Sequence, residues 1–149
     1  MKNKFEFTYR NLEKYYKQAL DAGYKIITCD EYALNKEITV PTIVNRVDID
    51  LSVKKTERLI DIYKKLDIKA TFFIRLHANE YNPFSFENYR IIRRIVDEGH
   101  EIGYHSEIID QGAIWNEDPK KCLERDIETL EKMFNVTIKG VASHGGLTG

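Results

Sequence analysis

Hydrophobic residues recur along this chain at two spacings, and each spacing predicts one kind of element. Apolar residues three and four positions apart predict amphipathic helices over residues 9–22, 52–66, 85–98 and 118–134. Short runs rich in β-branched and aromatic residues lie between these segments and are typical of strands. We predict strands at residues 25–29, 42–50, 70–74, 101–104 and 136–142, and a helical turn at residues 30–34.

The order of these elements predicts the fold class. After residue 40, four strands alternate with three helices, which is the pattern of βα units on a parallel sheet. We expect one α/β domain over residues 1–149, with a helix–strand extension at about 5–40 and a core at about 41–149. A closed barrel of parallel strands takes about 200 residues or more. We therefore expect a partial or open (β/α) barrel that lacks the C-terminal strands of a full barrel.

Composition and charge narrow the class of protein. The chain has 149 residues and a formal net charge of −1, so it lacks the basic excess of a nucleic-acid-binding surface. No apolar stretch approaches the roughly 18 residues of a membrane span, and the N-terminus has no apolar core of a signal peptide. Cys29 and Cys122 are far apart in sequence and form no CxxC motif, so we predict that both are buried free thiols. We predict a cytoplasmic protein, with an open sheet edge that a second copy of the chain could cover.

Two aspartates at alternate positions give the first indication of chemistry. Asp48 and Asp50 close a β-branched run, and residues two apart on a strand share a face. Two close carboxylates raise each other's pKa unless a cation compensates them. A metal ion would bind one carboxylate and leave the other free for proton transfer. The alternative is that the strand ends at Val47 and both aspartates are solvated residues that cap the next helix.

Polar residues also follow the other predicted strands. Arg75 and His77 come after the second strand of the core, His105 and Glu107 after the third, and His144 after the fourth. In parallel α/β folds, functional residues gather at the carboxyl ends of the strands. Imidazole together with carboxylate is the ligand set expected for zinc or a similar divalent ion.

Each of these residues also has a purely structural interpretation. His105 could be a hydrogen-bonded histidine at a strand end, and His144 could be a solvated residue near the chain end. Arg75 could bind an anionic substrate group or only pair with a carboxylate. Glu107 could be a ligand, a ligand orienter or an exposed acid, and His77 could be a loop residue. We expect a structural or surface role for His100, which lies at the opposite end of its strand.

Three segments of the chain resemble a known family. Residues 46–50 (RVDID), 70–73 (ATFF) and 99–105 (GHEIGYH) resemble the polysaccharide deacetylase superfamily, also called the NodB-homology domain. The resemblance covers about residues 43–144 and is strongest to a divergent branch with a D-x-D first motif and a GHEIG-aromatic-H motif. It implies an irregular (β/α) barrel with a divalent metal held by one aspartate and two histidines.

The resemblance also implies roles for individual residues. Asp50 matches the metal-binding aspartate, Asp48 the catalytic base and His105 the first histidine ligand. The second histidine of that motif would fall at Ile109, so this ligand is missing, and Glu107 or His144 could replace it. We assign Asp50, His105 and His144 as metal ligands. The late histidine that serves as general acid in the family would lie beyond residue 149.

These observations predict a metal-dependent hydrolase with zinc as its cofactor. It would remove an N-acetyl or N-formyl group from an amino sugar or polysaccharide precursor, with Arg75, His77 and Glu107 binding the substrate. The alternative is a degenerate or truncated deacetylase-like domain that binds a carbohydrate or a protein partner without catalysis. A truncated domain would need further strands or a second copy for activity.

Overall fold

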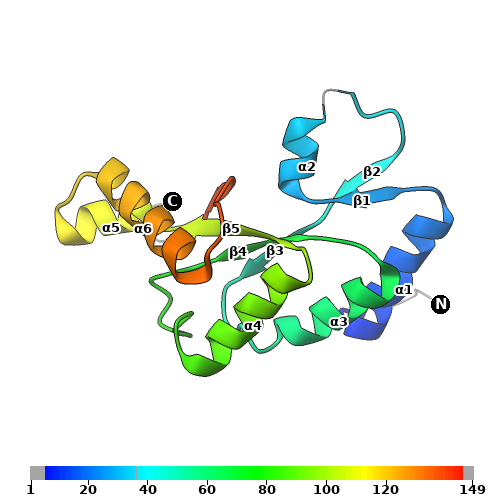
Figure 1. Ribbon diagram of the computed structural model, residues 1–149, viewed down its shortest axis with the longest axis horizontal. Coiled ribbons are helices and arrows are strands. Elements are labelled where there is room, and N and C mark those ends of the chain that lie inside the picture. The colour runs from blue at the N-terminus through cyan, green and yellow to red at the C-terminus, as the bar shows by residue number, and fades with distance from the viewer. Residues whose placement is uncertain (1–5, 36, 146–149) are drawn as a thin grey trace.

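A curled, four-stranded parallel sheet forms the centre of the computed structural model, which describes residues 6–35 and 37–145 (Figure 1). The strands are hydrogen-bonded in their order along the chain, as expected for successive right-handed βα units. This arrangement confirms the prediction of a partial, open (β/α) barrel. The four strands are β3 (Arg46–Ile49), β4 (Thr71–Ile74), β5 (Glu101–Ser106) and β6 (Val141–Ser143).

Helices cover the outer face of this sheet and bury its apolar side chains. Phe72 and Phe73, whose side chains point to opposite faces of β4, are both buried, so the strand is covered on both faces. Ser85 and Asp118 cap the helices that they were predicted to begin, and each accepts a hydrogen bond from a backbone N–H of the first turn. The helices of the core are α3 (Thr56–Leu66), α4 (Phe86–Asp97), α5 (Ile108–Trp115) and α6 (Pro119–Phe134).

The described residues before β3 form a separate small layer, which includes β2 (Thr42–Val44) at the start of the predicted core. α1 (Tyr9–Asp21) packs against α3, while β1 (Lys25–Ile27) and β2 form a two-stranded parallel sheet. With α2 (Cys29–Leu34), this sheet projects to one side of the core (Figure 1). Over the described residues, no helix combines the length and apolar character needed to cross a membrane.

The predicted single strand at residues 42–50 was wrong, because it divides at Asn45 into β2 and β3. The Asn45 N–H donates to Ile27 O of one sheet, and the Asn45 carbonyl accepts from Thr71 N of the other. Its buried side chain accepts a hydrogen bond from Tyr16 Oη at 2.6 Å and donates one to Lys69 O at 3.1 Å. Asn45 therefore holds the position at which the chain passes from one sheet to the other.

Other boundaries also differ from the prediction. α3 begins at Thr56 rather than at Ser52, because residues 53–56 form a turn in which Thr56 N donates to Val53 O. The last strand occupies 141–143 instead of 136–142. Glu131 explains this shift, since its backbone and side-chain oxygens accept hydrogen bonds from the N–H groups of residues 136 and 138 and hold them against α6.

Two further features of the core were not predicted. α5 was missed because its apolar residues do not follow a single helical face, and Ile109 and Ile114 are exposed. Both cysteines are free as expected, but Cys29 is only half-buried, whereas Cys122 is buried.

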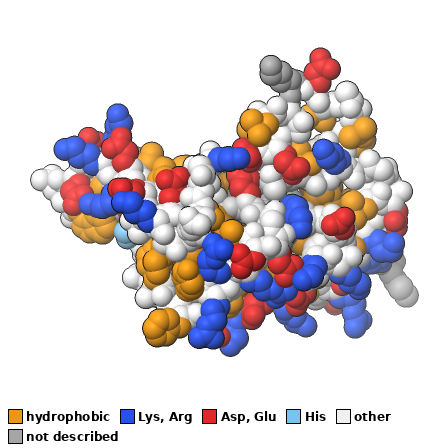
Figure 2. Space-filling model, viewed as in Figure 1, with side chains coloured by type: hydrophobic (Ala, Val, Ile, Leu, Met, Phe, Trp, Pro, Cys, Tyr) orange, Lys and Arg blue, Asp and Glu red, His pale blue; other side chains and the backbone are white. Residues whose placement is uncertain are grey.

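The surface over α3 and α4 carries charges of both signs. Figure 2 shows Lys and Arg side chains interspersed with Asp and Glu along this part of the molecule. Arg94 of α4 pairs with Asp61 of α3 at 2.6 Å, and Lys64 of α3 pairs with Glu98 at 3.2 Å. Exposed pairs of this kind stabilise a fold by about 1 kcal/mol or less each, so these pairs contribute little to the stability of the helix packing.

Candidate metal centre

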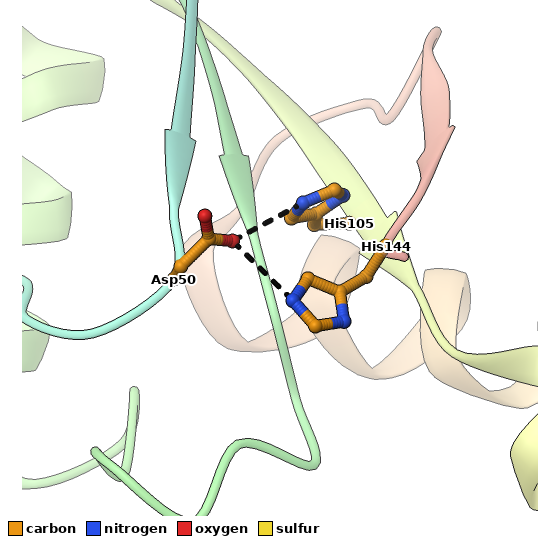
Figure 3. Close-up of side chains that lie close together, drawn as sticks. All are labelled: Asp50, His105 and His144. Carbon is orange, nitrogen blue, oxygen red and sulfur yellow. Dashed lines mark ion pairs between the residues drawn. The ribbon is translucent and has the colours of Figure 1, made fainter. Parts of the chain in front are cut away.

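Three potential ligand side chains meet at the carboxyl edge of the sheet (Figure 3). Asp50 directly follows β3, His105 lies in β5, and His144 follows β6. Asp50 Oδ1 lies 3.3 Å from His105 Nε2 and 3.7 Å from His144 Nε2. One donor atom from each residue lies within 4.8 Å of the other two. The predicted ligands, which are far apart in sequence, are therefore neighbours in the structure.

Hydrogen bonds to backbone groups hold the segments that carry these side chains. Parallel pairing aligns His105 with Ala142, and the next ladder bond runs from His144 N to Ser106 O at 2.8 Å. At the end of β3, Tyr81 Oη donates to Ile49 O at 2.7 Å. His144 thus extends the β5–β6 pairing and is not a solvated residue of a loose chain end.

The hydrogen bond of His105 determines which of its ring nitrogens carries the proton. His105 Nδ1 lies 2.9 Å from Ala142 O, and a carbonyl can only accept, so Nδ1 donates. In the neutral ring, Nε2 then presents a lone pair toward Asp50 Oδ1. Asp50 Oδ1 is buried and has no hydrogen-bond donor among the described residues. Acceptors facing each other at this distance repel unless a cation or a proton lies between them, so these residues fit a divalent metal ion.

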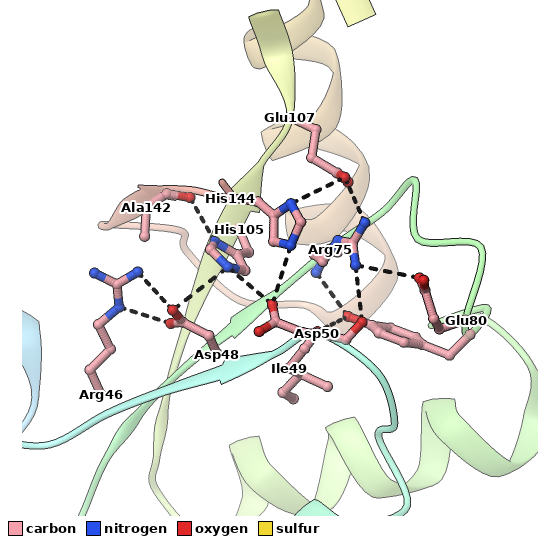
Figure 4. A network of polar contacts seen from close by, with 11 residues as sticks. Arg46, Asp48, Ile49, Asp50, Arg75, Glu80, His105, Glu107, Ala142 and His144 are labelled. Carbon is pink, nitrogen blue, oxygen red and sulfur yellow. Dashed lines mark hydrogen bonds and ion pairs between the residues drawn. The ribbon is translucent and has the colours of Figure 1, made fainter. Parts of the chain in front are cut away.

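Asp48 lies beside this cluster on the same face of the strand, as the alternation along β3 predicts. Its Oδ2 is 3.6 Å from His105 Nε2. Arg46 donates a hydrogen bond to each carboxylate oxygen of Asp48, from Nε to Oδ1 at 2.8 Å and from Nη2 to Oδ2 at 2.9 Å (Figure 4). Pairing with Asp48 raises the pKa of Arg46, whose guanidinium also lies 5.1 Å from the ring centre of Phe73. The arginine keeps the Asp48 carboxylate in one orientation.

The Phe73 ring occupies the space below these groups because a glycine faces it. Phe73 pairs with Gly103 on β5, and a Cβ atom at Gly103 would lie 2.4 Å from a ring carbon of Phe73. The ring centre also lies 6.5 Å from that of His105. Gly103 therefore allows the Phe73 ring to pack closely against β5, and this places an apolar side chain next to His105.

Arg75 is buried and links two sides of the candidate site. Its Nη1 donates to Asp50 O at 3.0 Å, and its Nη2 donates to Glu107 Oε1 at 2.7 Å. Glu80 approaches Nη1 at 3.4 Å. Burial lowers the pKa of Arg75, but its pairing with Glu107 and Glu80 outweighs burial and leaves that pKa above the ordinary value. On its other side, Glu107 Oε1 lies 3.6 Å from His144 Nδ1.

His77 belongs to a different set of contacts. Its Nε2 lies 3.0 Å from Asp126 Oδ2 on α6, and its ring meets Trp115 edge-on at 5.1 Å. Asp126 is buried and also accepts hydrogen bonds from Tyr104 Oη at 2.6 Å and Gln111 Nε2 at 2.7 Å. Burial raises the pKa of Asp126, but these three partners outweigh burial and lower it overall.

His100 lies at the amino end of β5, away from the cluster, as its position in the sequence predicted. It is buried, and its Nδ1 accepts a hydrogen bond from Ala70 N at 3.2 Å. Burial and the nearby positive charge of Lys69 lower the pKa of His100 to about 4. This histidine is therefore a neutral part of the core.

Sequence reasoning missed Arg46, Gln111 and Asp126 among the residues that support the site. Arg46 could have been found, because it is two residues before Asp48 and so shares its face. The other two lie on α5 and α6, and no local pattern marks their contacts with His77.

The fold and the site together define a parallel α/β domain with a candidate Asp-His-His metal centre at the carboxyl edge of its sheet. The family model named polysaccharide deacetylase matches residues 41–148, and the chain belongs to this family. A search of curated proteins found no match. Family membership supports a deacetylase-type hydrolase with a carbohydrate substrate, in a family that is generally metal-dependent. α1, β1 and α2 precede the matched residues.

Proposed function

We propose that this chain is a metal-dependent hydrolase that removes an N-acetyl or N-formyl group from an amino sugar or a polysaccharide precursor. Asp50, His105 and His144 would hold a divalent ion, which we propose to be zinc. The convergence of Asp50 Oδ1 with the Nε2 atoms of both histidines within 4.8 Å carries this proposal. One carboxylate and two imidazoles leave a position open in a tetrahedral zinc site, as catalytic sites require.

The surrounding residues have roles in the proposed reaction. A bound zinc ion would polarise the acyl oxygen and activate water for attack on the acyl carbon. Asp48 would accept the proton of the attacking water as general base, because each carboxylate oxygen keeps a lone pair beyond the one that Arg46 occupies. Arg46 would hold Asp48 in the orientation for that transfer.

A large groove beside Asp48 provides space for a substrate. It has a volume of about 980 Å³, which is within the range of small-molecule sites, and it lies between α1 and α3. Arg46 and Asp48 line it together with aromatic residues such as Tyr9 and Tyr16. We propose that the sugar approaches the metal centre from this groove.

The three residues predicted to bind substrate differ in the solvent exposure of their side chains. The His77 side chain is 31% exposed, whereas those of Arg75 and Glu107 are 10% and 12% exposed and paired with each other. Direct contact with a substrate is therefore proposed for His77, and an indirect contribution for the other two.

Metal analysis of purified protein tests the proposed centre. Wild type should bind one equivalent of zinc, and Asp50→Ala, His105→Ala and His144→Ala should each lose it. His100→Asn is the matched control, because this histidine lies in the same motif but outside the cluster. If wild type holds no divalent ion under any loading condition, the hydrolase proposal is refuted and a non-catalytic carbohydrate- or protein-binding domain becomes the better account.

Activity is then measured as acetate or formate released from N-acylated amino-sugar oligosaccharides. Asp48→Asn should retain zinc but lose turnover by about 100-fold or more, the usual contribution of a general base. Wild-type turnover in Asp48→Asn would show that another group accepts the proton.

A further inference from the structure

Polar atoms without hydrogen-bond partners are concentrated around the proposed centre. In the described parts of the chain, five buried side-chain nitrogen or oxygen atoms have no partner. Four of them belong to the Asp50–Arg75–Glu107–His144 group, and the fifth is Glu101 Oε1. Buried polar groups are normally hydrogen-bonded, so this concentration calls for an explanation at the site itself.

The two histidines of the cluster differ in how their outer nitrogens are held. His105 Nδ1 is fixed by Ala142 O at 2.9 Å, whereas His144 Nδ1 is one of the unpaired atoms. The nearest carboxylate oxygen to His144 Nδ1 is Glu107 Oε1, at 3.6 Å. The backbone of His144 is anchored through Ser106 O, but that bond does not fix the orientation of the ring.

Glu107 lies on the side of the His144 ring that faces away from the metal ligands. The Nε2 side of the ring faces Asp50 at 3.7 Å, while the Nδ1 side faces Glu107 (Figure 4). Glu107 is thus placed to accept a hydrogen bond from His144 Nδ1 and not to bind the ion itself. A small cavity of about 40 Å³ next to Glu107 and His144 leaves room for the movement that would close this contact.

Arg75 holds Glu107 in that place. It donates to Glu107 Oε1 at 2.7 Å through Nη2 and to the carbonyl of Asp50 at 3.0 Å through Nη1. One buried guanidinium therefore connects the backbone of the aspartate ligand with the partner of the second histidine.

From these contacts we infer that Glu107, anchored by Arg75, is the positioning residue of His144. Glu107 accepts a hydrogen bond from the Nδ1–H group, which keeps the proton on Nδ1, so that His144 Nε2 presents its lone pair to the ion beside His105. Arg75 and Glu107 thus let a histidine that directly follows β6 serve in the place of the family histidine that is missing at Ile109. This inference rests on the proposed metal site, and it assigns Arg75 and Glu107 to holding a ligand.

Zinc affinity, measured by competition with a chromogenic chelator, tests the inference without relying on turnover. Glu107→Ala should weaken zinc binding by about 10- to 100-fold, the usual effect of removing the hydrogen-bond partner of a ligand. Glu80→Ala is the matched control, because Glu80 also pairs with Arg75 but has no contact with His144 in the structure. It should bind zinc as wild type does.

A double-mutant cycle separates positioning from a general loosening of the fold. His144→Ala should not retain zinc on purification, but its weaker residual affinity can be measured at higher free zinc. In that background, Glu107→Ala should cause no further loss of affinity. Glu107→Asp keeps a carboxylate near Arg75 but shortens the side chain by one methylene group, so it should also weaken zinc binding. This variant replaces Glu107→Ala in the test if Glu107→Ala does not fold. The visible spectrum of the cobalt-loaded protein should change in Glu107→Asp and stay unchanged in Glu80→Ala.

The outcomes distinguish this inference from the proposed function. Wild-type zinc affinity in both Glu107 variants, or an equal loss with and without His144, would overturn the inference and leave the metal site intact. Failure of the wild-type protein to bind zinc would overturn the proposed function as well.

Discussion

His100 and His105 are five residues apart in one motif, and the structure gives them different environments. His100 accepts a hydrogen bond from Ala70 N and packs edge-on against Phe72 and Tyr63, with ring centres 5.3 and 5.9 Å away. A protonated ring could not accept the Ala70 hydrogen bond and would place a charge in the core. Protonation of His100 should therefore destabilise the fold.

The size and sign of this effect follow from the two pKa values. His100 titrates near its ordinary value of 6.5 when the chain is unfolded and at about 4 when it is folded. Between these values the unfolded chain binds the proton and the folded chain does not, so acid favours unfolding. The contribution of His100 is complete above pH 6.5 and is lost as the pH falls toward 4. At 1.36 kcal/mol per pKa unit, the loss is about 3 kcal/mol.

Urea unfolding of wild type and His100→Asn across this pH range measures the loss. Asparagine keeps an acceptor for Ala70 N but does not titrate, and it gives up the packing of the ring, so the variant should be less stable near pH 7. The difference in unfolding free energy between the two proteins should shrink by about 3 kcal/mol toward pH 4. A difference that stays constant with pH would refute the assignment of His100 as a buried neutral histidine.

Three further changes have expected outcomes. Gly103→Ala should lower the free energy of unfolding by about 1–3 kcal/mol, seen as a lower melting temperature in a thermal scan, because its Cβ would meet an aromatic ring of β4 at 2.4 Å. Tyr104→Phe should cost about 1–3 kcal/mol in urea unfolding, because the buried Asp126 carboxylate loses its 2.6 Å hydrogen bond, yet zinc affinity should be unchanged. In the His144→Ala variant, Ile109→His should restore zinc binding measured by chelator competition, since residues 109 and 144 line the same small cavity. No gain over His144→Ala alone would show that α5 cannot supply a ligand.

Elements that depend on local signals were predictable from the sequence, and those that depend on distant hydrogen bonds were not. The helices capped by Ser85 and Asp118 begin where their caps predict. The break at Asn45 was not predictable, because its β-branched neighbours favour one continuous strand. Partners from α1, β1 and β4 impose the change of sheet there.

The sequence predicted at which edge of the sheet the residues of the candidate site lie, but not their side-chain partners. Parallel pairing brings the residues that follow each strand to one edge, and strand alternation puts Asp48 and Asp50 on one face. The partners of Arg75 and His77 could not be predicted, because Glu107 and Asp126 are 32 and 49 residues away along the chain. Side-chain pairs at that separation depend on how the helices pack against the sheet.

The register between β5 and β6 explains why His144, rather than Glu107, stands beside His105. The resemblance allowed either residue to replace the histidine missing at Ile109, and we assigned His144 as the ligand. Pairing of His105 with Ala142 places the Ala142 carbonyl against one ring nitrogen of His105 and brings His144 to within 5.1 Å of its ring, centre to centre. The same pairing leaves Glu107 behind the His144 ring. In a parallel sheet, the register of a neighbouring strand can thus place a histidine beside the proposed metal site when the helix carries none at the expected position.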